Sequence, residues 1–300
     1  MLRSSYKNHF KDYHPLITFI FFISVLVFLV TLTNPVFLLT GFTAWLFYVF
    51  LLFRIKAFLK TFAYSLPMIL FIALINPLFN DYGNTPLLYI NDRPITLEAL
   101  LFGAFTGIMI LSMIYLFKAF DKCIDAHKFL YLFGRIIPTI ALMITMTMRF
   151  IPYFNRKLKI INQTQHTMGV TTSGGSIRNR LKSGTNILSV LVSYSLEGTV
   201  DTADSMKARG YGLKGKTNYN SYVITFRDAI LLLLVVAFDI YFGIALAKGT
   251  FNFEYNPDLT KIVYDANLII SVIIYFVFMG MPIFINLLEE IRWKLSRLKI

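Results

Sequence analysis

Few residues of this sequence have a type and spacing that could perform chemistry. The only cysteine is Cys123, so no disulfide or cysteine cluster can form within the chain. The four histidines make no H-x-x-x-H or H-E-x-x-H pattern: His9, His14, His127 and His166. We therefore expect no metal site and no cofactor.

Asp239 is the one carboxylate in the middle of a long apolar run. An ionisable residue inside a membrane is a functional-site hypothesis by default, because burying its charge is costly. The side chain could carry an ion or proton, or it could be bonded to a Ser or Thr of a neighbouring helix.

Two glycine-rich stretches imitate nucleotide-binding motifs. Residues 210–215 fit G-x-G-x-x-G literally, but they close a predicted helix, whereas the dinucleotide fingerprint opens one after a strand. Residues 169–175 lack the Lys-Ser/Thr pair of a phosphate-binding loop. If ATP drives this protein, we expect the ATPase to be another chain.

The sequence Ala208-Arg209-Gly210 is a more informative pattern. Gly210 suits the position just beyond a helix C-terminus, where glycine is favoured. Arg209 then lies in the last turn, where a cation suits the helix dipole. A planar guanidinium presented there could bind a carboxylate of a partner protein, or it could simply cap its own helix.

The composition places these residues in a membrane protein. Of 300 residues, 56% are hydrophobic and only 15% are charged, whereas soluble domains carry about 25% charged residues. Six segments are long and apolar enough to cross a bilayer, which takes about 20 residues: 15–32, 36–53, 62–79, 97–117, 229–246 and 268–288. We therefore predict an all-α, polytopic fold.

The distribution of charge predicts the orientation. With six spans and a cytoplasmic N-terminus, only Arg93, Lys248 and Lys261 of the 29 Lys and Arg residues face outward, as the positive-inside rule requires. A seventh apolar run, 136–148, is too short to span, and a crossing there would turn the basic residues after it outward. We expect it to be re-entrant or packed on the bundle. The net charge of +13 is thus topological, and no nucleic-acid partner is expected.

The segment between the fourth and fifth spans is too long for a connector and too apolar for disorder. It predicts amphipathic helices at 129–168, with a bend near Pro152, and at 187–209, separated by a flexible breaker at 169–176. In the second helix Glu197, Asp201 and Asp204 form a stripe apart from the apolar one. The chain divides into spans one to four (1–117), coupling helices (118–227), spans five and six (228–288) and a basic tail (289–300).

Several stretches resemble the transmembrane T component of energy-coupling factor transporters, the CbiQ-like family. Residues 202–212, preceded by Ser195-Leu196-Glu197, are similar to the second Ala-Arg-Gly coupling motif of that family. The stretch 148–152, with Arg149 and Pro152, resembles the segment that opens the first coupling helix. Residues 76–80 and 95–100 are similar to family sequence around the third and fourth spans.

The resemblance implies a non-enzymatic scaffold in a bacterial cell membrane with both termini in the cytoplasm. It would bind a membrane-embedded S component for vitamin or metal-ion uptake, and two ATPase subunits through Ala208-Arg209-Gly210 and the matching first motif. That first motif reads Thr167-Met168-Gly169, which keeps the glycine and lacks the arginine. Arg149, Pro152, Glu197 and Asp204 would support the coupling helices.

Two other classes remain as alternatives. A stand-alone secondary transporter using Asp239 would show paired inverted repeats and broken helices, whereas we find four spans followed by two. A membrane enzyme would need several His, Glu or Asp residues near the bilayer, and Asp239 alone does not supply them.

Overall fold

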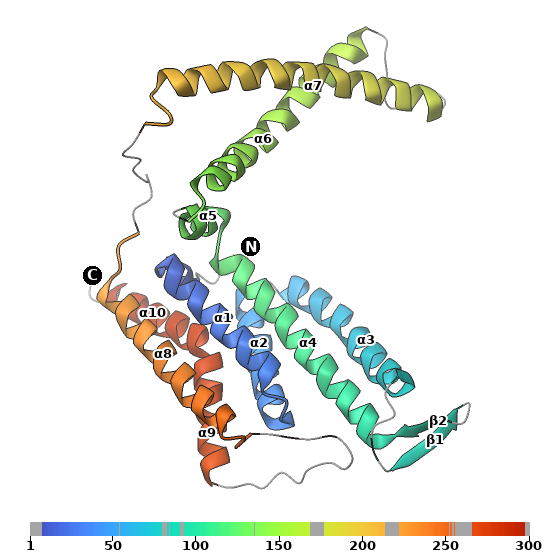
Figure 1. Cartoon of the computed structure of the whole chain (residues 1–300), viewed down its shortest axis with the longest axis vertical. Helices are drawn as coiled ribbons and strands as arrows, with labels where there is room; N and C mark the ends of the chain where they lie inside the picture. Colours follow the sequence, from blue (N-terminus) through green and yellow to red (C-terminus); the bar gives the residue numbers. More distant parts are fainter. Residues whose placement is uncertain are drawn as a thin grey trace. The chain divides into compact units, whose positions relative to one another are not determined.

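The computed structural model of the chain is almost entirely helical over the residues that it describes (Figure 1). These are residues 8–53, 55–79, 83, 85–90, 93–134, 136–168, 177–213, 222–251, 253, 255 and 266–297. The elements in chain order are η1 (His9–Asp12), α1 (Pro15–Thr31), α2 (Pro35–Leu52), α3 (Ile55–Phe79), β1 (Pro86–Ile90), β2 (Arg93–Thr96), α4 (Leu97–Cys123), α5 (Ala126–Gly134), α6 (Pro138–Thr167), α7 (Ile177–Ala208), α8 (Phe226–Ala247), α9 (Ala266–Met279) and α10 (Met281–Arg297). The predicted all-α membrane fold is confirmed.

The chain forms two compact units. The first, the helical bundle, comprises Met1–Phe129 and Tyr222–Ile300, and the second, the α6–α7 unit, comprises Leu130–Ser221. Each is described by itself below.

Local sequence signals start the bundle helices. Pro35 follows the N-cap Asn34, whose side chain accepts the amide of Val36, and α1 begins in the same way at His14 and Pro15. A proline at the first helical position costs nothing, because its missing amide would be unpaired there anyway.

Aromatic side chains fill the core of the bundle. Phe22 of α1 packs edge-on against Phe120 of α4, at 5.4 Å between ring centroids. Phe37 of α2 packs in the same way against Tyr275 of α9, at 5.2 Å. Such edge-to-face pairs are favourable beyond the area that they bury, so they fix how the helices pack.

The predicted spans correspond to helices, with one correction. Four helices are long and apolar enough to cross a membrane, namely α2, α3, α4 and α8, and the apolar α1 is slightly shorter. The predicted single helix at 268–288 is wrong: α9 and α10 meet at Gly280 with a bend of 58°. Pro282 explains the break, because it has no amide for the carbonyl of Phe278. The number of crossings stays a prediction.

The helix α3 packs tightly against α4 at the two glycines of Gly103-x-x-x-Gly107. A Cβ on Gly103 would lie only 2.7 Å from the Cβ of Asn76, and one on Gly107 would lie 3.4 Å from the Cα of Ile69. Small residues allow this approach, so this face is used within the bundle. Between the two helices, β1 and β2 form an antiparallel hairpin that our prediction did not include.

The cytoplasmic-helix prediction needs two corrections. Residues 129–168 are not one helix: α5 ends at Gly134 and α6 begins at Pro138. Ile137 has an extended φ of −131°, because a residue before proline disfavours the helical region. The helix α6 continues through Pro152 and begins within the 136–148 run, and none of its side chains is buried. Whether this run is re-entrant or packed on the bundle stays a prediction. The helix α7 begins ten residues before the predicted start, in a stretch whose Arg, Leu and Lys residues favour helix.

Candidate functional site

The α6–α7 unit is built on the crossing of its two long helices (Figure 1). At the crossing the Oη of Tyr153 in α6 donates a hydrogen bond to the Oη of Tyr194 in α7, at 2.8 Å. The Nζ of Lys157 lies 4.2 Å from the centroid of the Tyr194 ring, close enough for a cation–π attraction. This three-residue contact joins the helices near their middles.

The electrostatics of the crossing follow from these contacts. The Lys157 ammonium lowers the pKa of Tyr194, and the hydrogen bond to Tyr194 raises the pKa of Tyr153. Only a weak signal for this cluster is present in the sequence. Tyr153 and Lys157 share a face of α6 at a four-residue step, but nothing in the sequence pairs them with Tyr194.

Arg149 and Pro152 lie near this crossing rather than at a helix end. Arg149, together with Arg156, lines a cavity of about 350 Å³ whose other wall is α7 at Gly198 and Thr199. The carbonyl of Pro152 accepts a hydrogen bond from the Nε of Arg156 at 3.3 Å. These residues therefore lie at the crossing, and their supporting role stays a prediction.

The C-terminus of α7 has the predicted cap. Helix α7 ends at Ala208, and Gly210 has φ +78°, the left-handed conformation that favours glycine. The amide of Tyr211 donates to the carbonyl of Met206 at 3.0 Å, and that of Gly210 donates to the carbonyl of Lys207 at 2.9 Å. This pair of bonds defines a Schellman motif.

The cap presents Arg209 to solvent. The Arg209 side chain is exposed, and across the ranges that the structure describes it forms no ion pair. Its amide is held by the carbonyl of Ser205 at 3.1 Å. Asp204 and Glu197 are also exposed, and Asp204 faces Lys207 at 3.8 Å within the same helix. The backbone at Arg209 is thus fixed while its guanidinium is available.

The end of α6 differs in chemistry. The helix ends at Thr167, whose Oγ1 donates to the carbonyl of Thr164 at 2.7 Å. Met168 is 71% exposed, and Gly169 lies outside the described residues. The residue that follows α6 is thus apolar, whereas Arg209, which follows α7, is a cation. The candidate residues are thus distributed over the crossing and two helix ends, and they do not form one cluster.

The apolar stripe of α7 is uncovered within the described part of the chain. Leu188, Leu196 and Val200 are each more than half exposed, at 57%, 65% and 61%. A continuous exposed apolar surface of this kind marks contact with a membrane or another protein.

Asp239 lies in the bundle, where it accepts a hydrogen bond from the Oγ of Ser24 of α1. It therefore has the serine partner on a neighbouring helix that the sequence left open. A role in transport stays a prediction.

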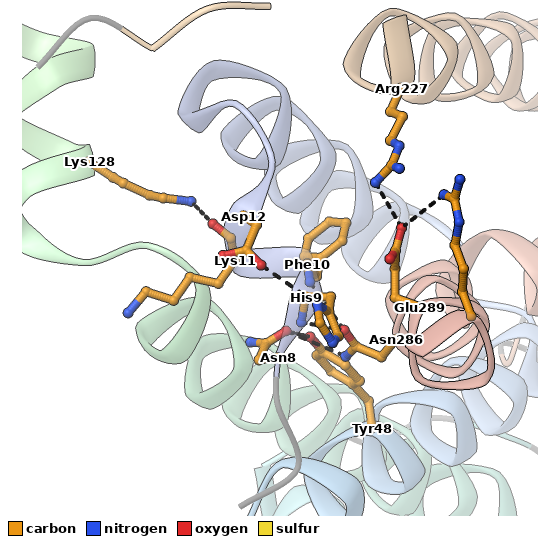
Figure 2. A network of polar contacts seen from close by, with 11 residues as sticks. Asn8, His9, Phe10, Lys11, Asp12, Tyr48, Lys128, Arg227, Asn286 and Glu289 are labelled. Carbon is orange, nitrogen blue, oxygen red and sulfur yellow. Dashed lines mark hydrogen bonds and ion pairs between the residues drawn. The ribbon is translucent and has the colours of Figure 1, made fainter. Parts of the chain in front are cut away.

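A polar network holds the N-terminal segment Asn8–His14 in the bundle (Figure 2). The side-chain oxygen of Asn286, a buried residue of α10, accepts the amides of His9 and Phe10 at 2.8 and 3.1 Å. The Nδ2 of Asn8 donates to the Sγ of Cys123 at 3.3 Å. The first turn of the segment is thus capped by Asn286 of α10, and Cys123 of α4 binds the side chain of Asn8.

The same segment contacts both places where the chain leaves and re-enters the bundle. On the α5 side, buried Lys128 donates to the carbonyl of Lys11 (Figure 2) and to that of Tyr13, and desolvation lowers the pKa of Lys128. On the α8 side, Asp228 accepts the amide of His14 at 3.0 Å. The segment therefore ties together the two connections to the α6–α7 unit.

Comparison with known proteins finds related sequences. The family model of the cobalt transport protein CbiQ matches residues 4–219. A relative from Exiguobacterium sibiricum, named energy-coupling factor transporter transmembrane protein EcfT, is 36% identical over 104 residues, 34% of this chain and 40% of the relative. The protein of the same name from Bacillus subtilis is 32% identical over 106 residues, again 34% and 40%. An uncharacterized protein of Mycoplasma genitalium is 24% identical over 178 residues, 56% of this chain and 42% of that protein. The chain thus matches about two fifths of the length of these relatives.

Proposed function

Because the chain belongs to the cobalt transport protein family CbiQ, we propose that it is the transmembrane scaffold subunit of an energy-coupling factor transporter. It couples ATP hydrolysis on two partner ATPase subunits to the movement of a small membrane-embedded S component. The S component captures the substrate, a vitamin or a metal ion, so no residue of this chain needs to bind it. The subunit lies in a bacterial cell membrane with both termini in the cytoplasm.

The observation that carries this proposal is the exposed cap Ala208-Arg209-Gly210 at the end of α7. The Schellman motif fixes its backbone, and the exposed guanidinium lies where a carboxylate of an ATPase groove can pair with it in bidentate geometry. The relatives named transmembrane protein EcfT support the same assignment.

The first ATPase contact lacks an arginine. At the end of α6, the exposed Met168 supplies apolar contact area in its place. The two ATPase contacts are then unequal, and the α7 end carries the charge-dependent one.

Movement passes between the two sites through the crossing of α6 and α7. A contact made at the end of α7 is transmitted along a continuous helix to Tyr194, and from there to Tyr153 of α6. Rigid helices joined at one contact can move as a unit when the ATPases close on ATP. The uncovered apolar stripe of α7 offers the S component a surface.

Co-purification in mild detergent tests the proposal. Tagged wild-type protein should bring down two ATP-hydrolysing chains and a small apolar membrane protein, identified by mass spectrometry. Arg209→Glu should lose the ATPases while still inserting in the membrane. The matched charge reversal Lys182→Glu, at an exposed position of the same helix, should keep them.

If Arg209→Glu co-purified with as much ATPase as the wild type does, Arg209 would not be needed to bind the ATPases. A chain that purifies alone and moves solute in reconstituted vesicles would replace the scaffold by the secondary-transporter alternative, in which Asp239 and Ser24 form the polar site.

A further inference from the structure

A groove of about 410 Å³ runs between α3 and α4 on the surface of the bundle. Lys60 and Lys118 line one end of it, and Met68 and Leu111 line the other. The groove is outside the candidate site described above, and the proposed coupling function makes no use of it.

At the basic end of the groove, a hydrogen bond holds one of the two lysines in place. Lys118 is half-buried, and its Nζ donates a hydrogen bond to the Oγ1 of Thr61 at 2.7 Å. Lys60 is exposed, and over the described ranges neither lysine forms an ion pair with a carboxylate. Two ammonium groups therefore share one end of a groove without a neutralising anion.

Two buried hydroxyls further along the groove already have partners. The hydroxyls of Ser65 and Tyr115 are bonded to each other at 3.0 Å. They need no ligand, and the wall beyond them, toward Met68 and Leu111, is apolar.

The basic-to-apolar change follows the direction of the helices. Lys60 and Met68 are eight residues apart on α3, which at 1.5 Å per residue places them about 12 Å apart along the helix axis. Lys118 and Leu111 are seven residues apart on α4, or about 10 Å. Because both lysines lie near the ends of apolar helices, the groove is basic at the expected level of lipid headgroups and apolar below it.

We propose that this groove binds a phospholipid with an anionic headgroup, its phosphate held by Lys60 and Lys118 and its acyl chain lying along Met68 and Leu111. The charge complementarity favours a lipid over a protein helix, which would have to bring its own carboxylate to this depth. The glycine face that allows close helix approach is moreover already occupied, since Gly103 and Gly107 pack against α3.

The lipid would cover a helix that the bundle leaves largely open. Of the described α3 residues only Ser65 and Pro77 are buried, and α3 packs mainly against α4. A bound lipid therefore bridges the two helices at the end opposite the glycine contact.

Lipid titration followed by native mass spectrometry tests this site on the purified full-length protein. Phosphatidylglycerol should bind the wild type at least about tenfold more tightly than phosphatidylcholine. The double variant Lys60→Gln/Lys118→Gln should lose this preference. The control Lys56→Gln/Lys122→Gln removes two exposed lysines from the same two helices, outside the groove, and should keep it.

Lys60→Gln alone guards against a folding defect, because Lys60 is exposed and forms no ion pair within the described residues. This variant should weaken phosphatidylglycerol binding several-fold. Equal losses in the groove and control pairs would overturn the proposal, since they would indicate non-specific attraction. Equal affinity for the two lipids, or displacement of phosphatidylglycerol by inorganic phosphate, would overturn it as well.

Discussion

Replacing Asn286 by alanine should loosen the N-terminal segment without unfolding the bundle. The Asn286 side chain is 1% exposed and accepts two backbone amides, those of His9 and Phe10. Alanine leaves the amide of the fully buried Phe10 without a partner, and an unpaired buried group costs about 1–3 kcal/mol. The His9 amide adds less, because it is only partly buried.

The loss appears as faster local opening of the segment. Because 1.4 kcal/mol is a factor of ten in an equilibrium constant, 1–3 kcal/mol corresponds to roughly 5- to 150-fold faster amide exchange. Hydrogen–deuterium exchange with mass spectrometry should detect this in peptides covering residues 8–14, and to a smaller extent around Lys128, which donates to the carbonyl of Tyr13.

The control is Glu290→Gln on the same helix, which breaks only the surface pair with Lys294 and should change exchange little, since exposed ion pairs contribute about 0–1 kcal/mol. Wild-type exchange of residues 8–14 in Asn286→Ala would refute the reasoning that this side chain holds the segment.

Three further predictions follow from individual contacts. Gly210→Ala should fray the end of α7, because a left-handed residue with a Cβ costs about 1 kcal/mol. Gly198→Ala in the same helix should instead stabilise it by about 0.5–1 kcal/mol, because the added Cβ meets nothing within 4 Å. Amide exchange over α7 separates the two variants, and equal effects would contradict the cap. Gly103→Ala should lower the thermal stability of the purified protein, because the added Cβ would lie 2.7 Å from the Cβ of Asn76. Gly243→Ala should not lower it, because its Cβ meets nothing within 4 Å. Equal thermal stability of the two variants would exclude tight α3–α4 packing. Lys11→Met should lower the free energy of unfolding by under about 1 kcal/mol at neutral pH. The hydrogen bond to Asp125 raises the pKa of Lys11, so the stabilisation by this lysine is present below the ordinary lysine pKa and is lost as pH rises through the raised pKa. A stability difference between variant and wild type that grows with pH would contradict this pH dependence.

The sequence predicted the membrane elements well because their signal is local. The apolar runs and Gly210 can each be recognised within one continuous stretch of the sequence, and the helices begin or end close to the positions that they predict. The break at Gly280 was missed because the apolar run continues across it, although Pro282 was a sufficient reason to expect one.

Contacts between distant segments could not be predicted in this way. Asn286 and Asn8 are 278 residues apart, and Lys128 and Lys11 are 117 apart. The pairing of Tyr153 with Tyr194 depends likewise on where two helices cross. No periodicity in one sequence carries that information, so the anchoring of the N-terminal segment and the crossing cluster emerged only from the structure.

Photo-crosslinking from Tyr211 tests whether the end of α7 binds an ATPase subunit. This residue is 43% exposed and lies two positions beyond Arg209, and its backbone amide takes part in the cap. With a photoreactive phenylalanine at position 211, we predict an ATP-dependent crosslink to an ATP-hydrolysing chain that disappears when Arg209→Glu is added. A crosslink that persists in Arg209→Glu, or one that forms only to lipid, would contradict the account.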